Sequence, residues 1–150
     1  MELILWRHAD AERGEDDLER RLTAKGKKQA RCIAKWLSKR LPRKVVVLAS
    51  PARRAVQTAA ALTDRFRIVP QLDGSAAAGE LLAAAGWPDG EGTVIVVGHQ
   101  PSLGRAAALC LTGREIAWSM KKGGIWWLDG GGDGEPRRAA LRAVISPDFL

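Results

Sequence analysis

The chain contains only two histidines, and each stands directly after a run of apolar residues. Arg7 and His8 follow the first run, and His99 follows the last of three similar runs. The middle run is followed by Ser50 and, four residues later, by Arg54. An imidazole can attack a phosphoryl group, and the planar guanidinium fork of arginine suits phosphate oxygens. These residue types therefore indicate phosphoryl transfer.

The three apolar runs, residues 2–6, 45–49 and 93–97, have the length and composition of strands buried on both faces. If they are parallel neighbours, their carboxyl ends bring the polar groups to one crevice, where open α/β sheets bind ligands. One histidine at a strand end is usually structural. No packing requirement explains two histidines and two arginines at three strand ends, so we expect a functional site there.

A nucleophilic histidine keeps one ring nitrogen unprotonated while the other donates to a backbone or carboxylate acceptor. The positive charges of Arg7 and Arg54 disfavour protonation of His8, and their donors suit the oxygens of a transferring phosphoryl group. His99 precedes a helix expected to begin at Pro101, so its ring can hydrogen-bond a phosphoryl oxygen near a helix N-terminus.

Neither a metal nor another cofactor is expected, because each histidine has an arginine in its motif or across the crevice and no carboxylate stands at ligand spacing. The net charge of +7 predicts attraction to polyanions, including phosphorylated substrates. No zinc-ligand spacing or stacking aromatic pattern supports nucleic-acid binding. Much of the excess charge lies on the expected exposed face of one helix: Lys25, Lys27, Lys28, Arg31, Lys35, Lys39 and Arg40.

Helices are expected between the strands. The first is capped by Thr23 and continues at helical spacing until Pro42. In the second, Ser50 is the N-cap and Pro51 the first helical position, unless Ser50 instead contacts phosphate. Arg53 lies about 100° around that helix from Arg54 and is expected to point elsewhere. Further helices are expected at about 76–85 and from 101 to Gly113, where the last one ends.

A short edge strand is expected at 65–69, and residues 124–129 and 138–145 read as a hairpin joined by 130–136. Trp126 and Trp127 in that hairpin are expected to pack in the core. The Gly-rich 130–136 segment is not a phosphate loop, since it precedes a strand. The fold class is therefore α/β, a three-layer α/β/α sandwich with a mainly parallel central sheet and an antiparallel edge, in a single domain spanning 1–150. The polar stretch 7–22 can lie over the crevice.

Cys32 and Cys110 lie within apolar helical patterns without partner spacing, and no signal peptide or membrane-length segment is present. These features favour a cytoplasmic protein that does not contact membranes, with both thiols buried as small hydrophobes.

Three stretches resemble the histidine phosphatase superfamily, which has the phosphoglycerate mutase-like fold: Arg7-His8-Ala-Asp-Ala11, Ser50-Pro-Ala-Arg-Arg54-Ala-Val-Gln-Thr-Ala59 and Val97-Gly-His99-Gln-Pro-Ser. Leu22-Thr-Ala-Lys-Gly26 and the short chain are similar to its SixA-type branch of phosphohistidine phosphatases. The resemblance covers about residues 1–128. It implies that His8 is the nucleophile, that Arg7 and Arg54 clamp phosphate, and that His99 is the second histidine. Ser50 is similar to the motif's serine, with a structural or a catalytic role.

Many members of the superfamily protonate the leaving group with a carboxylic acid between the second and third motifs. Here Asp73 and Glu80 are the candidates, with Asp64, Asp89 and Glu91 nearby, and none stands in a context that compels the role. Without that acid, a substrate whose leaving group departs easily is favoured, and the P–N bond of phosphohistidine fits.

The resemblance thus implies a phosphohistidine phosphatase acting on a phosphorylated protein through an open crevice. Two alternatives stay open: a small-molecule phosphomonoesterase that uses the same site, and a non-catalytic module that binds phosphorylated ligands. A mutase is disfavoured, because no segment is long enough to form a lid that excludes water. Lys121 and Lys122 either reach the rim of the crevice or are solvated, and solvation is the favoured interpretation.

Overall fold

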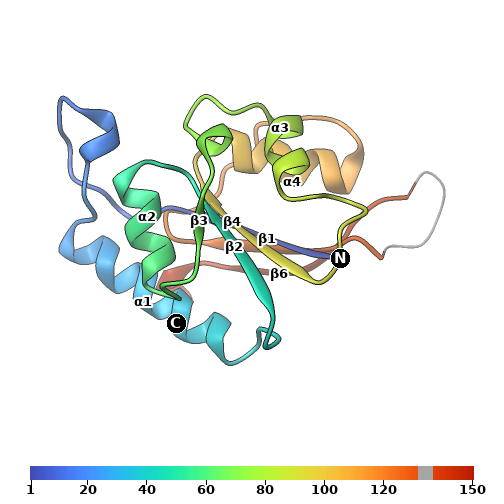
Figure 1. Ribbon diagram of the computed structural model, residues 1–150, viewed down its shortest axis with the longest axis horizontal. Helices are drawn as coiled ribbons and strands as arrows, with labels where there is room; N and C mark the ends of the chain where they lie inside the picture. The colour runs from blue at the N-terminus through green and yellow to red at the C-terminus, as the bar shows by residue number, and fades with distance from the viewer. Residues whose placement is uncertain (132–136) are drawn as a thin grey trace.

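The computed structural model describes residues 1–131 and 137–150 and contains a central sheet covered by helices on both faces (Figure 1). Among these residues the strands lie in the order β3-β2-β4-β1-β5-β6. Their bounds are β1 Glu2–Arg7, β2 Val45–Ala49, β3 Arg67–Ile68, β4 Thr93–Gly98, β5 Ile125–Asp129 and β6 Ala140–Ile145. The α/β sandwich expected from the sequence is confirmed.

The first four strands in this order run parallel, and the hairpin forms the antiparallel edge. β4 pairs in parallel with both β1 and β2, and β2 pairs in parallel with β3. β5 is antiparallel to β1, and β6 is antiparallel to β5. Trp6 and Ala49 are both in register with Val97. The three strands that carry the sequence motifs therefore end level with one another.

Alternate residues of β1 face the two helical layers, as the period of a strand requires. Ile4 and Trp6 pack against α1 (Ala24–Ser38) and α2 (Arg53–Ala60). Leu3 and Leu5 pack in the second core with α3 (Ala78–Ala84) and α4 (Ser102–Thr112). Burial of each such side chain contributes about 1.5–3 kcal/mol. This packing on both faces fixes the strands whose ends carry the motifs.

The start of α1 follows the sequence pattern, because the Thr23 side chain accepts a hydrogen bond of 2.9 Å from the Gly26 backbone N–H. Gly26 is required here because a Cβ atom would collide with the Asp10 carbonyl oxygen. The helix ends at Ser38, before Pro42, although Leu41 still packs against the core.

The predicted start of α2 is wrong. Ser50 and Pro51 precede the helix, Ala52 is its N-cap without a side-chain hydrogen bond, and the first helical residue is Arg53. The Ser50 hydroxyl is engaged elsewhere, by His99. α4 begins at Ser102, one residue after the predicted start at Pro101. Its end at Gly113 is as predicted, and Gly113 adopts a left-handed φ of 78° there.

The described residues also contain three 3₁₀ helices: η1 Asp17–Glu19, η2 Pro70–Leu72 and η3 Pro147–Phe149. Trp127 lies in the core and Trp126 packs against Trp118 with ring centroids 5.6 Å apart, which confirms packing roles. Cys110 is buried, but Cys32 is half-buried rather than buried as expected. The predicted turn at 130–136, including its exclusion as a phosphate loop, lies largely outside the described residues.

None of the helices described is long and apolar enough to span a membrane.

Candidate active site

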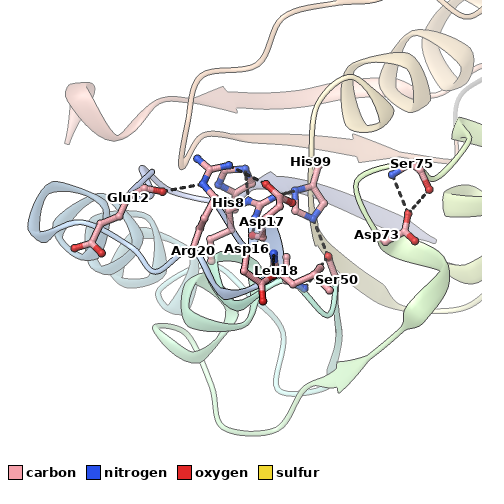
Figure 2. A network of polar contacts seen from close by, with 12 residues as sticks. His8, Glu12, Asp16, Asp17, Leu18, Arg20, Ser50, Asp73, Ser75 and His99 are labelled. Atoms are coloured by element: carbon pink, nitrogen blue, oxygen red, sulfur yellow. Dashed lines mark hydrogen bonds and ion pairs between the residues drawn. The ribbon is translucent and has the colours of Figure 1, made fainter. Parts of the chain in front are cut away.

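The carboxyl ends of β1, β2 and β4 surround a cleft of about 580 Å³. Figure 2 shows His8 and His99 close together, with Asp17 beside them and Asp73 farther along the same cleft. The convergence predicted from the strand ends is present for Arg7, His8, Arg54 and His99, which all line the cleft. The rest of its lining is Asp17 and Leu18 of η1, together with Arg20, Asp73, Gly74, Ser75 and Gln100, which lie outside the helices and strands.

His8 is fixed through both its backbone and its ring. Its backbone N–H donates to the Gly98 carbonyl at 3.0 Å, which ties β1 to β4 beyond the end of the strand. Nδ1 lies 2.8 Å from the Ala9 carbonyl, which can only accept, so Nδ1 carries the proton. Nε2 accepts from Arg54 Nε at 3.3 Å. Nε2 therefore presents an unprotonated lone pair at the cleft, as a nucleophile requires.

The electrostatic surroundings also keep His8 neutral. Burial is the largest cause of a low His8 pKa, which is about 3. The hydrogen bond to Ala9 opposes this shift, and the charges of Arg54 and Arg7 add to it. Only 9% of the residue is exposed, so water does little to stabilise an imidazolium here. At neutral pH the ring is unprotonated and ready to attack an electrophile.

His99 is held between Arg54 and Ser50. Its Nδ1 lies 3.3 Å from Arg54 Nη2, and a guanidinium can only donate, so Nδ1 is the acceptor. Nε2 then carries the proton and donates to the Ser50 hydroxyl at 2.7 Å. The two imidazole centroids are 5.1 Å apart. Burial first, and then the charge of Arg54, lowers the pKa of His99 to about 4.

Arg54 joins the two histidines because it lies in the first turn of α2, next to the carboxyl ends of the strands. Its guanidinium is buried and donates from Nη1 to the Asp17 carbonyl at 2.7 Å and from Nη2 to the Asp17 carboxylate at 3.1 Å. The neighbouring Arg53 points away toward Glu19, 3.5 Å from it, as the helical geometry predicts.

Arg7 brings a half-buried guanidinium to the same cleft. Nη1 donates to the Met120 carbonyl at 2.6 Å, and burial lowers the pKa of the group. Its Nε is buried and has no hydrogen-bond partner among the described residues. Because an unpaired buried donor is costly, this atom is suited to an anionic ligand.

Ser50 lies beneath His99 and does not line the cleft. Its hydroxyl accepts from the Ala52 N–H at 3.2 Å and contacts His99 as described above. The residue is fully buried. In this geometry Ser50 positions His99, and it is not the N-cap of α2 that the sequence predicted.

The two acidic candidates named from the sequence have different surroundings. Asp73 lines the cleft, but its Oδ1 accepts from both the backbone N–H of Ser75, at 2.8 Å, and the Ser75 hydroxyl, at 2.6 Å. These bonds lower the pKa of Asp73. Glu80 accepts from the Ala77 N–H at 3.1 Å at the start of α3 and does not line the cleft, so that candidate was wrong.

Asp17 and Arg20 are site residues that the sequence analysis did not identify. They lie on the polar stretch that was expected to cover the crevice, and its position over the cleft is confirmed. Hydrogen bonds from Arg20 and Arg54 lower the pKa of Asp17. The stretch has no hydrophobic periodicity, so no signal in the sequence distinguishes these two residues from the other charged residues around them.

Lys122 forms an ion pair of 2.8 Å with Asp10, whereas Lys121 makes no ion pair with any described residue. Both side chains are exposed. Across residues 1–131 and 137–150 no group of three histidine, cysteine, aspartate or glutamate side chains is placed to hold a metal ion.

Comparison with known proteins gives one family match and three similar proteins. Residues 3–75 match the family described as the histidine phosphatase superfamily (branch 1). An uncharacterized protein of Picosynechococcus sp. is 35% identical over 146 residues, covering 87% of this chain and 86% of that protein. The protein histidine phosphatase SixA complexed with tungstate has a TM-score of 0.80 at 25% identity and 99% coverage of both chains. A SixA protein from Nakamurella multipartitia has a TM-score of 0.79 at 28% identity, covering 97% of this chain and 95% of that one.

Proposed function

Because the chain belongs to the histidine phosphatase superfamily, we propose that it is a phosphohistidine phosphatase in which His8 carries the phosphoryl group from substrate to water. Its fold is the phosphoglycerate mutase-like fold of the SixA structures, and it is a phosphatase with a histidine-based mechanism. The whole chain acts as one domain in this proposal, and its substrate is a phosphorylated protein in the cytoplasm.

The observation that carries the proposal is the state of the His8 ring. Nδ1–H is committed to the Ala9 carbonyl, and the Nε2 lone pair faces the Arg54 guanidinium in an open cleft. A structural histidine has no need for a cation aimed at its free nitrogen. A nucleophilic histidine needs such a cation, because the cation stabilises the negative charge on the phosphoryl oxygens in the transition state.

The reaction takes two steps. His8 Nε2 attacks phosphorus in line and the new N–P bond forms as the P–N bond to the substrate imidazole breaks. The substrate ring carries a proton from solvent on its other nitrogen, so it leaves as neutral imidazole with the electron pair of the broken bond. Arg54, Arg7 and His99 donate to the phosphoryl oxygens. His99 donates through Nδ1 in its other tautomer, in which the proton is on Nδ1 and the Ser50 hydroxyl donates to Nε2; the two tautomers interconvert by proton exchange with solvent before the substrate binds. Water then attacks phosphorus, giving inorganic phosphate and free His8.

The acids of the cleft support phosphohistidine as the substrate class. A general acid must be protonated near neutral pH, but the pKa values of Asp73 and Asp17 are both lowered by their hydrogen bonds. Neither carboxyl is suited to protonate an alkoxide leaving group. An imidazole leaving group depends less on such an acid, and this matches the similarity to SixA.

The test measures turnover and covalent labelling together. A radiolabelled phosphohistidine protein is incubated with the wild type and quenched in alkali, because the P–N bond is unstable in acid. We expect transient label on the wild type and none on His8→Ala, whose circular dichroism is unchanged. Arg54→Ala is expected to lose at least about a hundredfold in rate. Arg53→Ala, at the adjacent half-buried residue that does not line the cleft, is the matched control and keeps its rate.

Other results would overturn the assignment. A fully active His8→Ala protein would exclude the mechanism. Binding of phosphoprotein without turnover or label would identify a binding module. Equal kcat/KM for an alkyl phosphomonoester and a phosphohistidine protein would identify a general phosphomonoesterase.

A further inference from the structure

A second pocket, of about 680 Å³, adjoins the catalytic cleft. Three segments form it: the start of α1, the residues that precede β5, and η3 near the C-terminus. We call it the basic pocket, because its lining includes Arg7, Lys25, Lys121 and Lys122. Arg7 lines both this pocket and the cleft, so a ligand that extends from one to the other passes along a single guanidinium.

Positive charge in the basic pocket exceeds the negative charge available to neutralise it. Asp148 is the one acidic residue of its described lining. Lys122 is already paired with Asp10, at 2.8 Å. Lys25 and Lys121 are exposed and make no ion pair with any described residue. These two ammonium groups, beside the incompletely paired Arg7, leave the pocket with unused capacity for an anion.

The proposed reaction uses Arg7 but neither Lys25 nor Lys121. The transferred phosphoryl group is held by Arg54, Arg7 and His99. Of these three residues, only Arg7 also lines the basic pocket. An anion bound there must therefore belong to the part of the substrate that is not transferred. In a protein substrate, the anions available are the carboxylates of aspartate and glutamate near the phosphorylated histidine.

We propose that the basic pocket binds acidic side chains flanking the phosphohistidine and thereby selects among phosphorylated proteins. This inference rests on the proposed function and adds a substrate preference to it. Exposed ion pairs are individually weak, so Lys25 and Lys121 together account for a preference of about five- to tenfold rather than for essential binding. The preference weakens as salt screens the pairs.

The test compares three substrates at low salt: a phosphohistidine peptide with aspartate flanks, the same peptide with asparagine flanks, and phosphoramidate. In the wild type, kcat/KM for the aspartate peptide exceeds that for the asparagine peptide, and 0.5 M salt removes the difference. In the Lys25→Glu, Lys121→Glu double variant the ratio of kcat/KM for the aspartate peptide to that for phosphoramidate falls at least about tenfold.

A matched control separates the pocket from net charge. Lys35→Glu, Lys39→Glu changes the net charge by the same amount, at exposed positions near the C-terminal end of α1 that line neither pocket. This control keeps the preference for the aspartate peptide. Equal kcat/KM for the two peptides in the wild type, or an equal loss in the control, overturns the inference.

Failure of the proposed function is recognised separately, since the wild type would then hydrolyse none of the three substrates. In that event the inference is decided by fluorescence anisotropy with peptides that carry a stable phosphohistidine analogue. Tighter binding of the aspartate peptide that is lost in the pocket variant supports the basic pocket, and equal binding of both peptides rejects it.

Discussion

Asp17 accepts two hydrogen bonds from the guanidinium of Arg54. Its carbonyl oxygen lies 2.7 Å from Nη1, and its carboxylate lies 3.1 Å from Nη2. The arginine that we assign to the phosphoryl oxygens is thus also bound by a carboxylate. The Asp17 side chain is 65% exposed, so this contact can open toward solvent. An incoming phosphate must compete with the carboxylate for the same donors.

Asp17→Asn should therefore strengthen the binding of phosphate and vanadate. The substitution removes the negative charge that competes for Arg54 and leaves the Asp17 backbone carbonyl contact possible. Since the carboxylate is exposed, the gain is modest, about two- to fivefold in the inhibition constant. Inhibition of phosphoramidate hydrolysis measures it, with Asp16→Asn as a control of equal charge change. Unchanged or weaker inhibition in Asp17→Asn would contradict competition.

The strand ends were predictable because each buried strand is a continuous apolar run with an abrupt polar end. This pattern predicted that Arg7, His8 and His99 lie at one crevice, as they do. The resemblance to the family motif singled out Arg54, and the helical offset predicted that Arg53 points elsewhere. Asp17 was not predictable, because it lies in a charged stretch without periodicity whose course depends on tertiary contacts with Arg54.

The errors arose where a side chain had two possible partners. Ser50 before Pro51 is typical of a helix start, but the hydroxyl contacts His99 and the helix begins three residues later. Glu80 was a candidate acid by its position between the motifs, yet it bonds the backbone at the start of its own helix. In both cases the local sequence allowed either role, and the folded chain decided it.

Ser50→Ala should slow turnover by about ten- to a hundredfold. The fully buried hydroxyl is the partner of His99 Nε2, and its loss leaves that nitrogen unsatisfied at a cost of about 1–3 kcal/mol. His99 then has no partner that allows Nδ1 to carry the proton and donate to phosphate. We expect kcat to fall more than KM rises, because the substrate still meets Arg54 and Arg7. A wild-type kcat in Ser50→Ala would exclude the positioning role.

The pH dependence of kcat/KM should differ from that of an ordinary histidine nucleophile. The pKa of His8 is about 3 and that of His99 about 4, so both rings stay neutral far below the usual value. Protonation of His8 removes the attacking lone pair, and the rate must fall on the acid side. The profile is expected to stay flat from pH 8 to about 5 and to fall below about pH 4.

The measurement uses brief assays, with the spontaneous acid hydrolysis of the substrate subtracted at each pH. Circular dichroism at the same pH values separates loss of activity from unfolding. A limb centred near pH 6.5, the ordinary histidine value, would show that His8 is not held neutral by burial and its cationic neighbours.

The same low pKa values predict how stability depends on pH. In the unfolded chain both histidines titrate near 6.5, whereas in the folded protein they stay neutral to about pH 4 or below. Between these values the unfolded state binds more protons, so the contribution of the histidines to the free energy of unfolding falls as the pH drops; it levels off above about pH 7.5, where the unfolded histidines are neutral too. Below about pH 6, each histidine contributes a slope approaching about 1.4 kcal/mol per pH unit.

Urea denaturation at pH 7.5, 6.0 and 5.0 should show this loss in the wild type and about half of it in His8→Ala, whatever the absolute stability of the variant. Comparing the two slopes cancels the carboxylates, which both proteins share. Parallel curves for wild type and His8→Ala would mean that His8 takes up a proton in the folded protein, and the neutral nucleophile on which the mechanism depends would be lost with it.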